Sequence, residues 1–313
     1  MNRTAAIIIV NHNTGTILKE CINSVLQYED KDNLEIIIID NYSNDNSRLI
    51  ISELTQKHNF ISSIFTDSII SFSAANNLGI VKSGSEFVLI MNPDIIFTEP
   101  LLESLVSLMK TDEMIGAISP ALTGIDGKFQ RNYFQRYPSL KQFIYYHSVL
   151  APLFNKSAKR MNIYLENQDI EIDQKKIFYT EQIPCAFFLT RRTILDKIGL
   201  MDENFILFFE DVDLSYLVAK EGKLAVDTRL KVTHLGGSSF KTKDNWWMHG
   251  RYIVSMIYFF KKHYSGSKAF LLKFLVYINS YFVLSIEYVK KVFGIDDQYR
   301  INKHKYLLKL LKG

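Results

Sequence analysis

The segment Phe-Val-Leu-Ile-Met-Asn-Pro-Asp at residues 87–94 places a carboxylate directly after a continuous apolar run. The apolar residues predict a buried strand, and Asn92, Pro93 and Asp94 follow at its end. In α/β proteins, ligands bind at the carboxyl ends of strands, and Asp oxygens are ligands that Mg²⁺ and Mn²⁺ use beside phosphates. Because Asn-Pro-Asp is also ordinary turn chemistry, the neighbouring segments have to decide between the two interpretations.

The first hundred residues alternate between short apolar runs and stretches with helical spacing. Apolar side chains repeat at helical spacing over Ile17–Leu26, and Asn76–Gly79 is expected to open the helix before residue 87. This alternation predicts an α/β fold with a mostly parallel central sheet and helices on both faces. Polar or acidic residues directly follow three strands, which outlines a nucleotide-binding crevice. The strands are expected at residues 5–10, 35–39, 63–65 and 87–91.

Taken in order, the motifs resemble the inverting family 2 glycosyltransferases of the GT-A fold, particularly the rhamnosyltransferase-like branch. The resemblance covers about residues 5–240. It implies a GT-A catalytic domain over residues 1–240, with a donor-binding part at about 1–122 and an acceptor-side part at about 123–240, followed by a helical C-terminal region over 241–313. The segments that carry it are Ile7–Asn13, Ile39–Ser43, Phe72–Gly79, Asn92–Asp94, Gly199–Leu214 and Val232–Ser239.

By this resemblance, the strand ends cradle the nucleoside of a nucleotide sugar, and Asp40 contacts its base and ribose. Asn92 replaces the first Asp of the Asp-x-Asp-like metal motif, which lowers the local charge by one. The donor-binding residues that the resemblance implies are Asn11, Asn13, Asp40, Asn41, Ser43, Asn76, Asn77 and Asn92.

The departure of a nucleoside diphosphate builds negative charge, which a divalent cation or positioned donors must absorb. Asp94 would hold Mg²⁺ or Mn²⁺, and His234 is the second candidate ligand because neutral imidazole is a common metal ligand. His234 could instead donate to the diphosphate, or be an ordinary histidine at the end of a strand. The loop Gly236–Ser239 favours a functional role because its backbone can approach phosphates closely.

A single displacement with inversion also needs a general base for the acceptor hydroxyl. Glu210, Asp211 and Asp213 crowd three carboxylates into four residues, and like charges raise at least one pKa. By resemblance Asp211 is the base, with Glu210 as the alternative, while Asp213 is expected to cap a helix that begins there. Cys185 stands where the family usually has glycine, at a position expected beside a sugar.

Charge and hydropathy set the C-terminal region apart. The net charge of +4 hides 14 Lys or Arg against four Asp or Glu after residue 240. Residues 270–289 are apolar except for a stripe at Lys273, Ser280 and Glu287, and lysines flank them. This combination predicts a peripheral element on an anionic membrane surface, with packing on the catalytic domain or on a second subunit as alternatives. Nucleic-acid binding is disfavoured, since the basic residues alternate with bulky aliphatics.

The sequence therefore predicts an inverting, metal-assisted glycosyltransferase that uses dTDP-rhamnose, or next a UDP-hexose. Its acceptor would be a lipid-linked or growing cell-surface glycan. Two cysteines and the absence of a signal-like start favour the cytoplasm, at the inner face of the membrane, and a homodimer is possible. A nucleotidyltransferase and a non-catalytic scaffold of polysaccharide assembly are the alternatives. The former would need a basic, Gly-rich loop after the first strand, where Asn11–Gly15 has no Lys or Arg.

Overall fold

The computed structural model describes residues 3–130, 133–154, 176–236 and 245–312, and the chain divides into two compact units. The described residues of the first unit are 3–130, 133–136, 176–204 and 210–236. Those of the second unit are 137–154, 205–209 and 245–312. The units differ from the predicted domains because 137–154 and 205–209, expected on the acceptor side, belong to the second unit.

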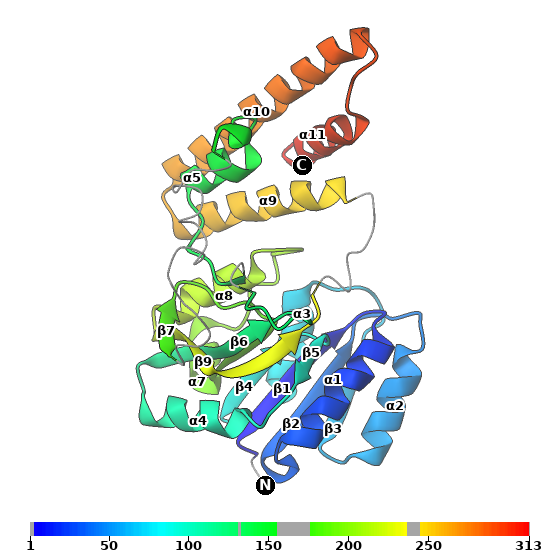
Figure 1. Ribbon diagram of the computed structural model, residues 1–313, viewed down its shortest axis with the longest axis vertical. Helices are drawn as coiled ribbons and strands as arrows, with labels where there is room; N and C mark the ends of the chain where they lie inside the picture. The colour runs from blue at the N-terminus through cyan, green and yellow to red at the C-terminus, as the bar shows by residue number, and fades with distance from the viewer. Residues whose placement is uncertain (1–2, 131–132, 155–175, 237–244, 313) are drawn as a thin grey trace. The chain divides into compact units, whose positions relative to one another are not determined.

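A nine-stranded sheet forms the centre of the first unit, with strand order β3-β2-β1-β4-β8-β6-β9-β5 and with β7 paired to β9 (Figure 1). Strands β3, β2, β1 and β4 are parallel, as the strand–helix alternation predicted. The rest is mixed, because β8 runs antiparallel to both β4 and β6, whereas β6 and β9 are parallel. The strands are β1 (Ala5–Asn11), β2 (Leu34–Asp40), β3 (Ile61–Phe65), β4 (Phe87–Met91), β5 (Ile95–Phe97), β6 (Ile115–Thr123), β7 (Ile177–Thr180), β8 (Phe187–Arg191) and β9 (Lys223–His234).

Helices cover both faces of this sheet (Figure 1). Successive strand side chains point to opposite faces, so Ile7 and Ile9 of β1 join one buried cluster with α1, α2 and α4. Ile8 joins a second cluster, with α3, α7 and α8. These helices are α1 (Gly15–Tyr28), α2 (Ser47–Lys57), α3 (Phe72–Lys82), α4 (Leu102–Thr111), α7 (Arg192–Ile198) and α8 (Glu210–Val218), and a short 3₁₀ turn spans Lys31–Asn33.

Two predicted helix starts are wrong. Helix α3 begins at Phe72, where the Ser71 hydroxyl accepts a hydrogen bond from the Ala74 backbone N–H at 3.2 Å, so Asn76–Gly79 lie inside the helix. Helix α8 begins at Glu210, which places Asp213 in its first turn. The helix starts after Ser71 because the Ser71 side chain caps it, and not at the Asn-rich motif as the sequence analysis predicted.

Strand register brings the polar segments to one edge of the sheet. Asn11 at the end of β1 lies opposite Asp40 at the end of β2, and Ile9 lies opposite Met91 at the end of β4. Met91 also pairs with Phe187 at the start of antiparallel β8. The residues that follow β1, β2 and β4 therefore share an edge with those that precede β8.

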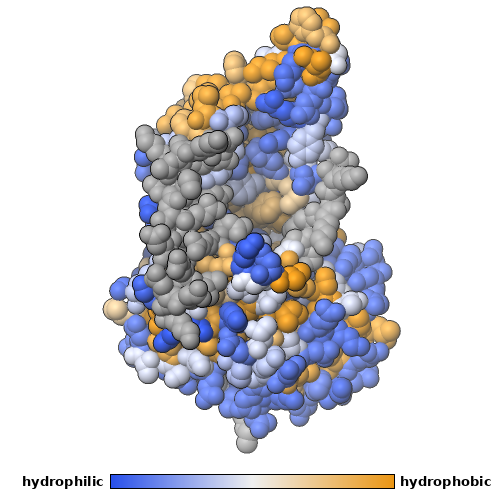
Figure 2. Space-filling model, in the orientation of Figure 1, coloured by the Kyte–Doolittle hydropathy of each residue, from blue (hydrophilic) through white to orange (hydrophobic). Residues whose placement is uncertain are grey.

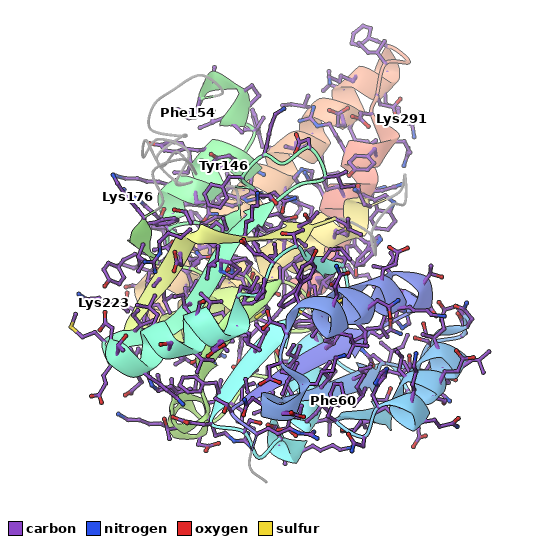
Figure 3. The ribbon with its side chains drawn as sticks, turned by 60° about the horizontal axis from the view of Figure 1, so that its bottom comes forward. Phe60, Tyr146, Phe154, Lys176, Lys223 and Lys291 are labelled. Atoms are coloured by element: carbon purple, nitrogen blue, oxygen red, sulfur yellow. The ribbon has the colours of Figure 1, made fainter. Side chains whose placement is uncertain are left out.

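The second unit is helical. Tyr146 and Phe154 in Figure 3 belong to two short helical segments of this unit, η3 and η4. Helix α10 packs on α11 and on α9, and its N-terminus is capped by Ser265, whose hydroxyl accepts from the Lys268 N–H. The helical segments are α5 (Leu140–Gln142), η3 (Phe143–His147), η4 (Ala151–Phe154), α9 (Trp246–His263), α10 (Gly266–Val292) and α11 (Gln298–Leu310).

Candidate active site

Asp40 joins the loops that follow β1 and β2. Its carboxylate is fully buried and accepts hydrogen bonds from Asn11 Nδ2 at 3.0 Å and from the Ser43 backbone N–H at 3.1 Å. Arg48 Nε donates to the same carboxylate at 3.2 Å. Because three donors already surround Asp40, its charge fixes the shape of the loop pair. The predicted residues Asn11, Asp40 and Ser43 are therefore brought together.

Asn13 and Tyr42 occupy the left-handed backbone region in the same loop pair, at φ +54° and +61°. The Asn13 N–H donates to Ser43 Oγ at 2.9 Å, which adds Asn13 to the cluster. Asn41 faces another way, because its amide exchanges hydrogen bonds with the backbone of Ile70. The Tyr42 ring is 50% exposed at the strand end and was not among the predicted site residues. The position of an aromatic residue directly after Asp40 and Asn41 was the sequence feature that could have identified Tyr42 as a site residue.

Asn76 and Asn77 make hydrogen bonds to other parts of the first unit. Asn77 Nδ2 donates to the Met201 carbonyl at 2.9 Å and to Glu203 Oε1 at 2.8 Å, and its Oδ1 accepts from the Met201 N–H at 3.0 Å. Asn76 Nδ2 donates to the Phe72 carbonyl within α3. Both side chains are buried, so Asn77 holds α3 against the segment that follows α7. The proposed contact of these two residues with the donor remains a prediction.

Asp94 and His234 meet where β5 pairs with β9. His234 Nε2 lies 3.5 Å from Asp94 Oδ1, and both side chains are buried. Gln130 Nε2 donates to the His234 carbonyl at 2.9 Å, which leaves Gln130 Oε1 to accept from His234 Nδ1 at 2.8 Å. This arrangement puts the imidazole proton on Nδ1 and turns the Nε2 lone pair toward the carboxylate.

A carboxylate oxygen and an imidazole lone pair that face each other fit a divalent cation. Burial lowers the pKa of His234, while the Asp94 charge opposes this, so the ring is neutral as a ligand must be. No group of three His, Cys, Asp or Glu that could hold a metal occurs among the described residues. The described residues thus offer two ligands at this point, which suits a cation that completes its shell with phosphates and water.

Two neighbours of this pair, Gln130 and Tyr133, come from a segment that the sequence analysis did not assign. The Tyr133 ring meets the His234 ring edge-on, with centroids 4.9 Å apart. Burial, and then the charge of Asp94, raise the pKa of Cys21 on α1. Gln130 and Tyr133 were missed because nothing local in the sequence marks them. Of the predicted loop after His234, residues 237–239 lie outside the described residues.

Glu210 and Asp211 form an acid pair at the start of α8. Burial, and second the Asp211 charge, raise the pKa of Glu210 to about 8. Burial also raises the pKa of Asp211 to about 6, although the Val212 N–H, which donates to Asp211 Oδ1 at 2.9 Å, opposes the rise. Glu210 Oε2 is buried with no hydrogen-bond partner in the described parts of the chain. Both pKa values are raised, so the pair keeps a proton near neutral pH.

The backbone before the acid pair is strained. Phe208 and Phe209 have φ of +65° and +70°, a region that bulky residues rarely adopt. Each such residue costs on the order of 1–3 kcal/mol, and this kind of strain concentrates at functional sites. Two consecutive strained residues directly before Glu210 support a functional role for the start of α8.

Cys185 connects the acid pair to the Asp94 turn. Burial, and then the charges of Asp211 and Glu210, raise the pKa of Cys185. The Ile183 N–H, two residues before Cys185, donates to Ser215 Oγ of α8 at 3.1 Å, which holds the segment that leads into β8 against α8. The Ala186 carbonyl accepts a hydrogen bond from the Asn92 N–H at 3.2 Å. The turn at Asn92–Asp94 and the acid pair therefore lie at the same edge of the sheet.

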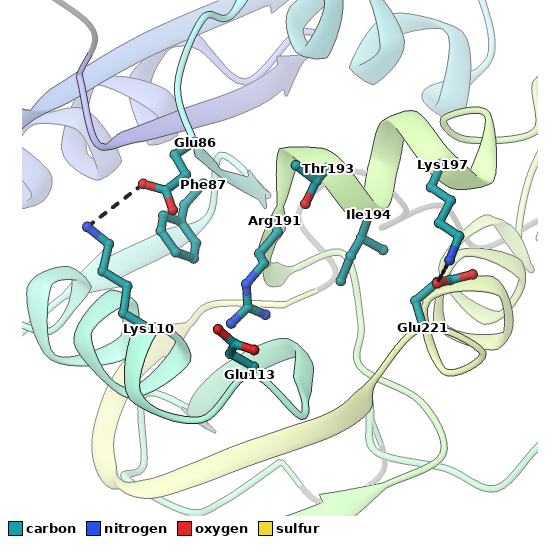
Figure 4. Close-up of a pocket in the computed structure, with 9 residues that line it drawn as sticks. All are labelled: Glu86, Phe87, Lys110, Glu113, Arg191, Thr193, Ile194, Lys197 and Glu221. Atoms are coloured by element: carbon teal, nitrogen blue, oxygen red, sulfur yellow. Dashed lines mark hydrogen bonds and ion pairs between the residues drawn. The ribbon is translucent and has the colours of Figure 1, made fainter.

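A pocket of about 420 Å³ lies at the opposite edge, where β4 begins and β8 ends (Figure 4). The Arg191 guanidinium at the end of β8 donates to the backbone carbonyls of Met109 and Ile115. Lys110 is 3.8 Å from Glu86 on the pocket wall. The positively charged side chains of this pocket thus have structural partners. The pocket is separate from the strand ends where the candidate residues lie.

Solved structures share this architecture. The crystal structure of GalNAc-T7 with UDP, GalNAc and Mn²⁺ superposes with a TM-score of 0.56 at 17% identity, over 74% of this chain and 43% of that one. The crystal structure of Staphylococcus aureus TarS 1–349 gives a TM-score of 0.53 at 12% identity, over 86% and 69%. The first unit therefore has the GT-A glycosyltransferase fold, as the sequence predicted.

Residues 6–199 match glycosyl transferase family 2, and the chain belongs to this family. It is 24% identical to a probable glycosyltransferase of Bacillus subtilis, YdaM, over 69% of this chain and 47% of the relative. The glycosyltransferase GlyG of Streptococcus pneumoniae is 29% identical over 34% of this chain and 35% of the relative. The chain thus spans between a third and a half of these two relatives. A Mycobacterium tuberculosis N-acetylglucosaminyl-diphospho-decaprenol L-rhamnosyltransferase is 21% identical over 72% and 74%.

Proposed function

We propose that the chain is an inverting glycosyltransferase that moves a sugar from a nucleoside diphosphate donor to a hydroxyl of a glycan acceptor. One observation carries the proposal: a buried acid pair with raised pKa values lies at the same sheet edge as the facing Asp94 and His234 side chains. A general base and a charge-absorbing site are the two devices that a single displacement requires.

Asp211 is the general base in this proposal. The raised pKa values leave one proton on the pair near neutral pH, and in this proposal Glu210 holds that proton while Asp211 is ionised. Asp211 accepts the proton of the acceptor hydroxyl. At the same time the hydroxyl oxygen bonds to the anomeric carbon, and the bond between that carbon and the diphosphate breaks. The oxygen attacks from the face opposite the leaving group, so the anomeric configuration inverts. Because Glu210 is protonated, no second negative charge lies beside the base.

The donor lies across the ends of β1, β2 and β4. Asp40 shapes the loops, and the exposed residues Asn13 and Tyr42 on these loops lie beside the nucleoside in this proposal. Asp94 and His234 would hold Mg²⁺ or Mn²⁺, which when bound neutralises charge on the departing diphosphate. The burial of Asp94 and His234 and the 3.5 Å between Asp94 Oδ1 and His234 Nε2 support this assignment.

For the donor we favour dTDP-rhamnose, with a UDP-hexose next. The similarity to a rhamnosyltransferase whose name gives a lipid-diphosphate acceptor supports a lipid-linked or growing cell-surface glycan as acceptor. With a lipid-linked acceptor we place this transfer at the cytoplasmic face of a membrane. Family membership favours this function over nucleotidyl transfer. A non-catalytic scaffold would show no sugar transfer, so a transfer assay distinguishes it from the proposed enzyme.

A thermal-shift panel with a transfer assay tests the proposal. We expect dTDP or UDP to raise the melting temperature more in the presence of Mn²⁺ or Mg²⁺, and Asp94→Ala to lose that metal dependence. Asp211→Asn should keep the shift but lose transfer, while exposed Glu53→Gln serves as the matched carboxylate control. If no nucleotide produces a shift, the donor site is wrong and the scaffold alternative gains support.

A further inference from the structure

Helix α10 turns Asn279, Ser280 and Glu287 toward the side that packs within the second unit. Glu287 is fully buried and binds Arg300 at 2.9 Å, Lys290 at 3.2 Å and the Asp297 N–H at 2.9 Å. Asn279 Oδ1 accepts from the Val149 N–H at 2.7 Å. Soluble proteins usually point a helix the other way, with its polar face toward water.

The outward face of α10 is apolar and aromatic, and Figure 2 shows this side of the helix as hydrophobic. Exposed fractions reach 72% at Phe270 and 83% at Val292. At 1.5 Å per residue, this face extends over about 33 Å. We call it the α10 face; its exposed side chains include Phe270, Phe274, Ile278, Phe282, Val289 and Val292.

Lysines border the α10 face. Lys273 and Lys291 are exposed and 18 residues apart, which is five helical turns, so both lie on the same flank. Lys268 is exposed near the other border. Long lysine side chains can lie along apolar surface while their ammonium groups reach polar lipid headgroups. The one acidic residue of the helix, Glu287, is neutralised inside the unit and does not oppose an anionic partner.

We infer that the α10 face is a docking surface for an anionic lipid bilayer and that α10 lies in the plane of the membrane interface. By length and composition α10 could cross a membrane, but about a third of its most apolar window is buried within the chain. Its inner side is covered by α11, which carries exposed Lys305 and Lys309. Lipid on one side and a charged helix on the other fit an interfacial position.

A second copy of the chain fits this face less well. In a two-fold antiparallel pairing centred on Phe282, Lys273 of one chain would lie opposite Lys291 of the other, because the two positions are equally far from that centre. Like charges at both ends of the contact oppose such a dimer, whereas anionic headgroups complement the same lysines. This inference is independent of the proposed sugar transfer.

Vesicle flotation of the full chain tests the surface. We expect binding to phosphatidylcholine vesicles that contain phosphatidylglycerol, and about tenfold weaker binding for Phe274→Gln/Phe282→Gln, because two half-buried rings are lost from the lipid. Val81→Gln/Met114→Gln, at positions equally exposed in the first unit, should bind like the parent. Lys273→Gln/Lys291→Gln should lose about tenfold in binding to the anionic vesicles, and Lys19→Gln/Lys57→Gln should not.

Equal vesicle binding by the parent and Phe274→Gln/Phe282→Gln, with both folded by circular dichroism, would overturn the inference. So would sedimentation that shows a parent dimer dissociated by this variant. Depth is read from a polarity-sensitive dye on Phe274→Cys and, for comparison, on Lys309→Cys, since both native thiols are buried. We expect vesicle addition to shift the dye emission to shorter wavelength at position 274 and not at position 309. Equal shifts at both positions would contradict the in-plane geometry.

Discussion

Gln130 and His234 exchange two hydrogen bonds across 104 residues of sequence, so that the amide fixes both the backbone and the ring of the histidine. The neighbouring Tyr133 ring packs edge-on against the same imidazole. An imidazole held from Nδ1 offers only Nε2 to a ligand, and Nε2 is the atom that faces Asp94. The geometry of the candidate cation site therefore depends on a glutamine outside it.

Replacing Gln130 with leucine should weaken Mn²⁺ binding in the presence of nucleotide by about 10–100-fold, because the ring loses its hydrogen-bond acceptor and its fixed orientation. Isothermal titration calorimetry measures the change, and exposed Gln56→Leu on α2 is the matched control. Unchanged Mn²⁺ affinity in folded Gln130→Leu would remove His234 from the ligand set.

Glu210→Gln should stabilise the fold at alkaline pH. The folded pKa of Glu210 is raised from 4.5 to about 8, so between these values the folded state binds more protons than the unfolded state, and stability falls as pH rises. Above about pH 8 the variant should exceed the parent by at least about 1 kcal/mol in free energy of unfolding. Urea denaturation at both ends of this range measures the gain, and Glu53→Gln should show none.

The rate of transfer should fall as Asp211 becomes protonated. Its raised pKa of about 6 predicts that kcat/KM drops about tenfold per pH unit below that value, since only the carboxylate accepts the hydroxyl proton. Nucleotide binding by thermal shift at the same pH values is the control. A profile that stays flat from pH 7 to pH 5 would contradict the assignment of Asp211 as base.

The sequence predicted those parts of the fold that depend on interactions between residues close together in the chain. The alternation of strands and helices, the apolar strand cores and the placement of Asp94 and Asp40 at strand ends all follow from periods of two and 3.6 residues. The strand register of β1, β2 and β4 then brings Asn11, Asp40 and Asn92 to one edge. Those features were confirmed because buried parallel strands tolerate few alternatives.

Long-range partners were not predictable from the sequence. Nothing near Gln130 or Tyr133 indicates that they meet a histidine about a hundred residues away. The Asn76–Asn77 motif suggested donor contacts, whereas the amide of Asn77 is held by Met201 and Glu203. The polar residues Ser280 and Glu287 on α10 were visible in the sequence, but only their burial in the structure reveals that this part of the helix faces inward.

Asn77→Ala should lower the free energy of unfolding by about 2 kcal/mol, because the buried backbone groups of Met201 lose both partners. The exposed Asn59→Ala should change it by less than about 0.5 kcal/mol. Nucleotide affinity of folded Asn77→Ala, measured by titration calorimetry, tests the predicted donor contact, and an affinity equal to the parent's would leave Asn77 with a structural role. A large loss of affinity with unchanged stability would instead place Asn77 at the donor.

Gly79 in α3 is required by its neighbours across the sheet face. A Cβ added there would lie 2.5 Å from Ile8 Cγ2 and 2.8 Å from Ile39 Cδ1, so Gly79→Ala overpacks a buried contact. The expected cost of about 1–3 kcal/mol exceeds the gain of up to about 1 kcal/mol from better helix propensity. Gly84→Ala meets nothing within 4 Å and should leave the urea midpoint unchanged or slightly higher. If both variants unfold at the same midpoint, α3 does not pack against β1 and β2 as closely as these distances require.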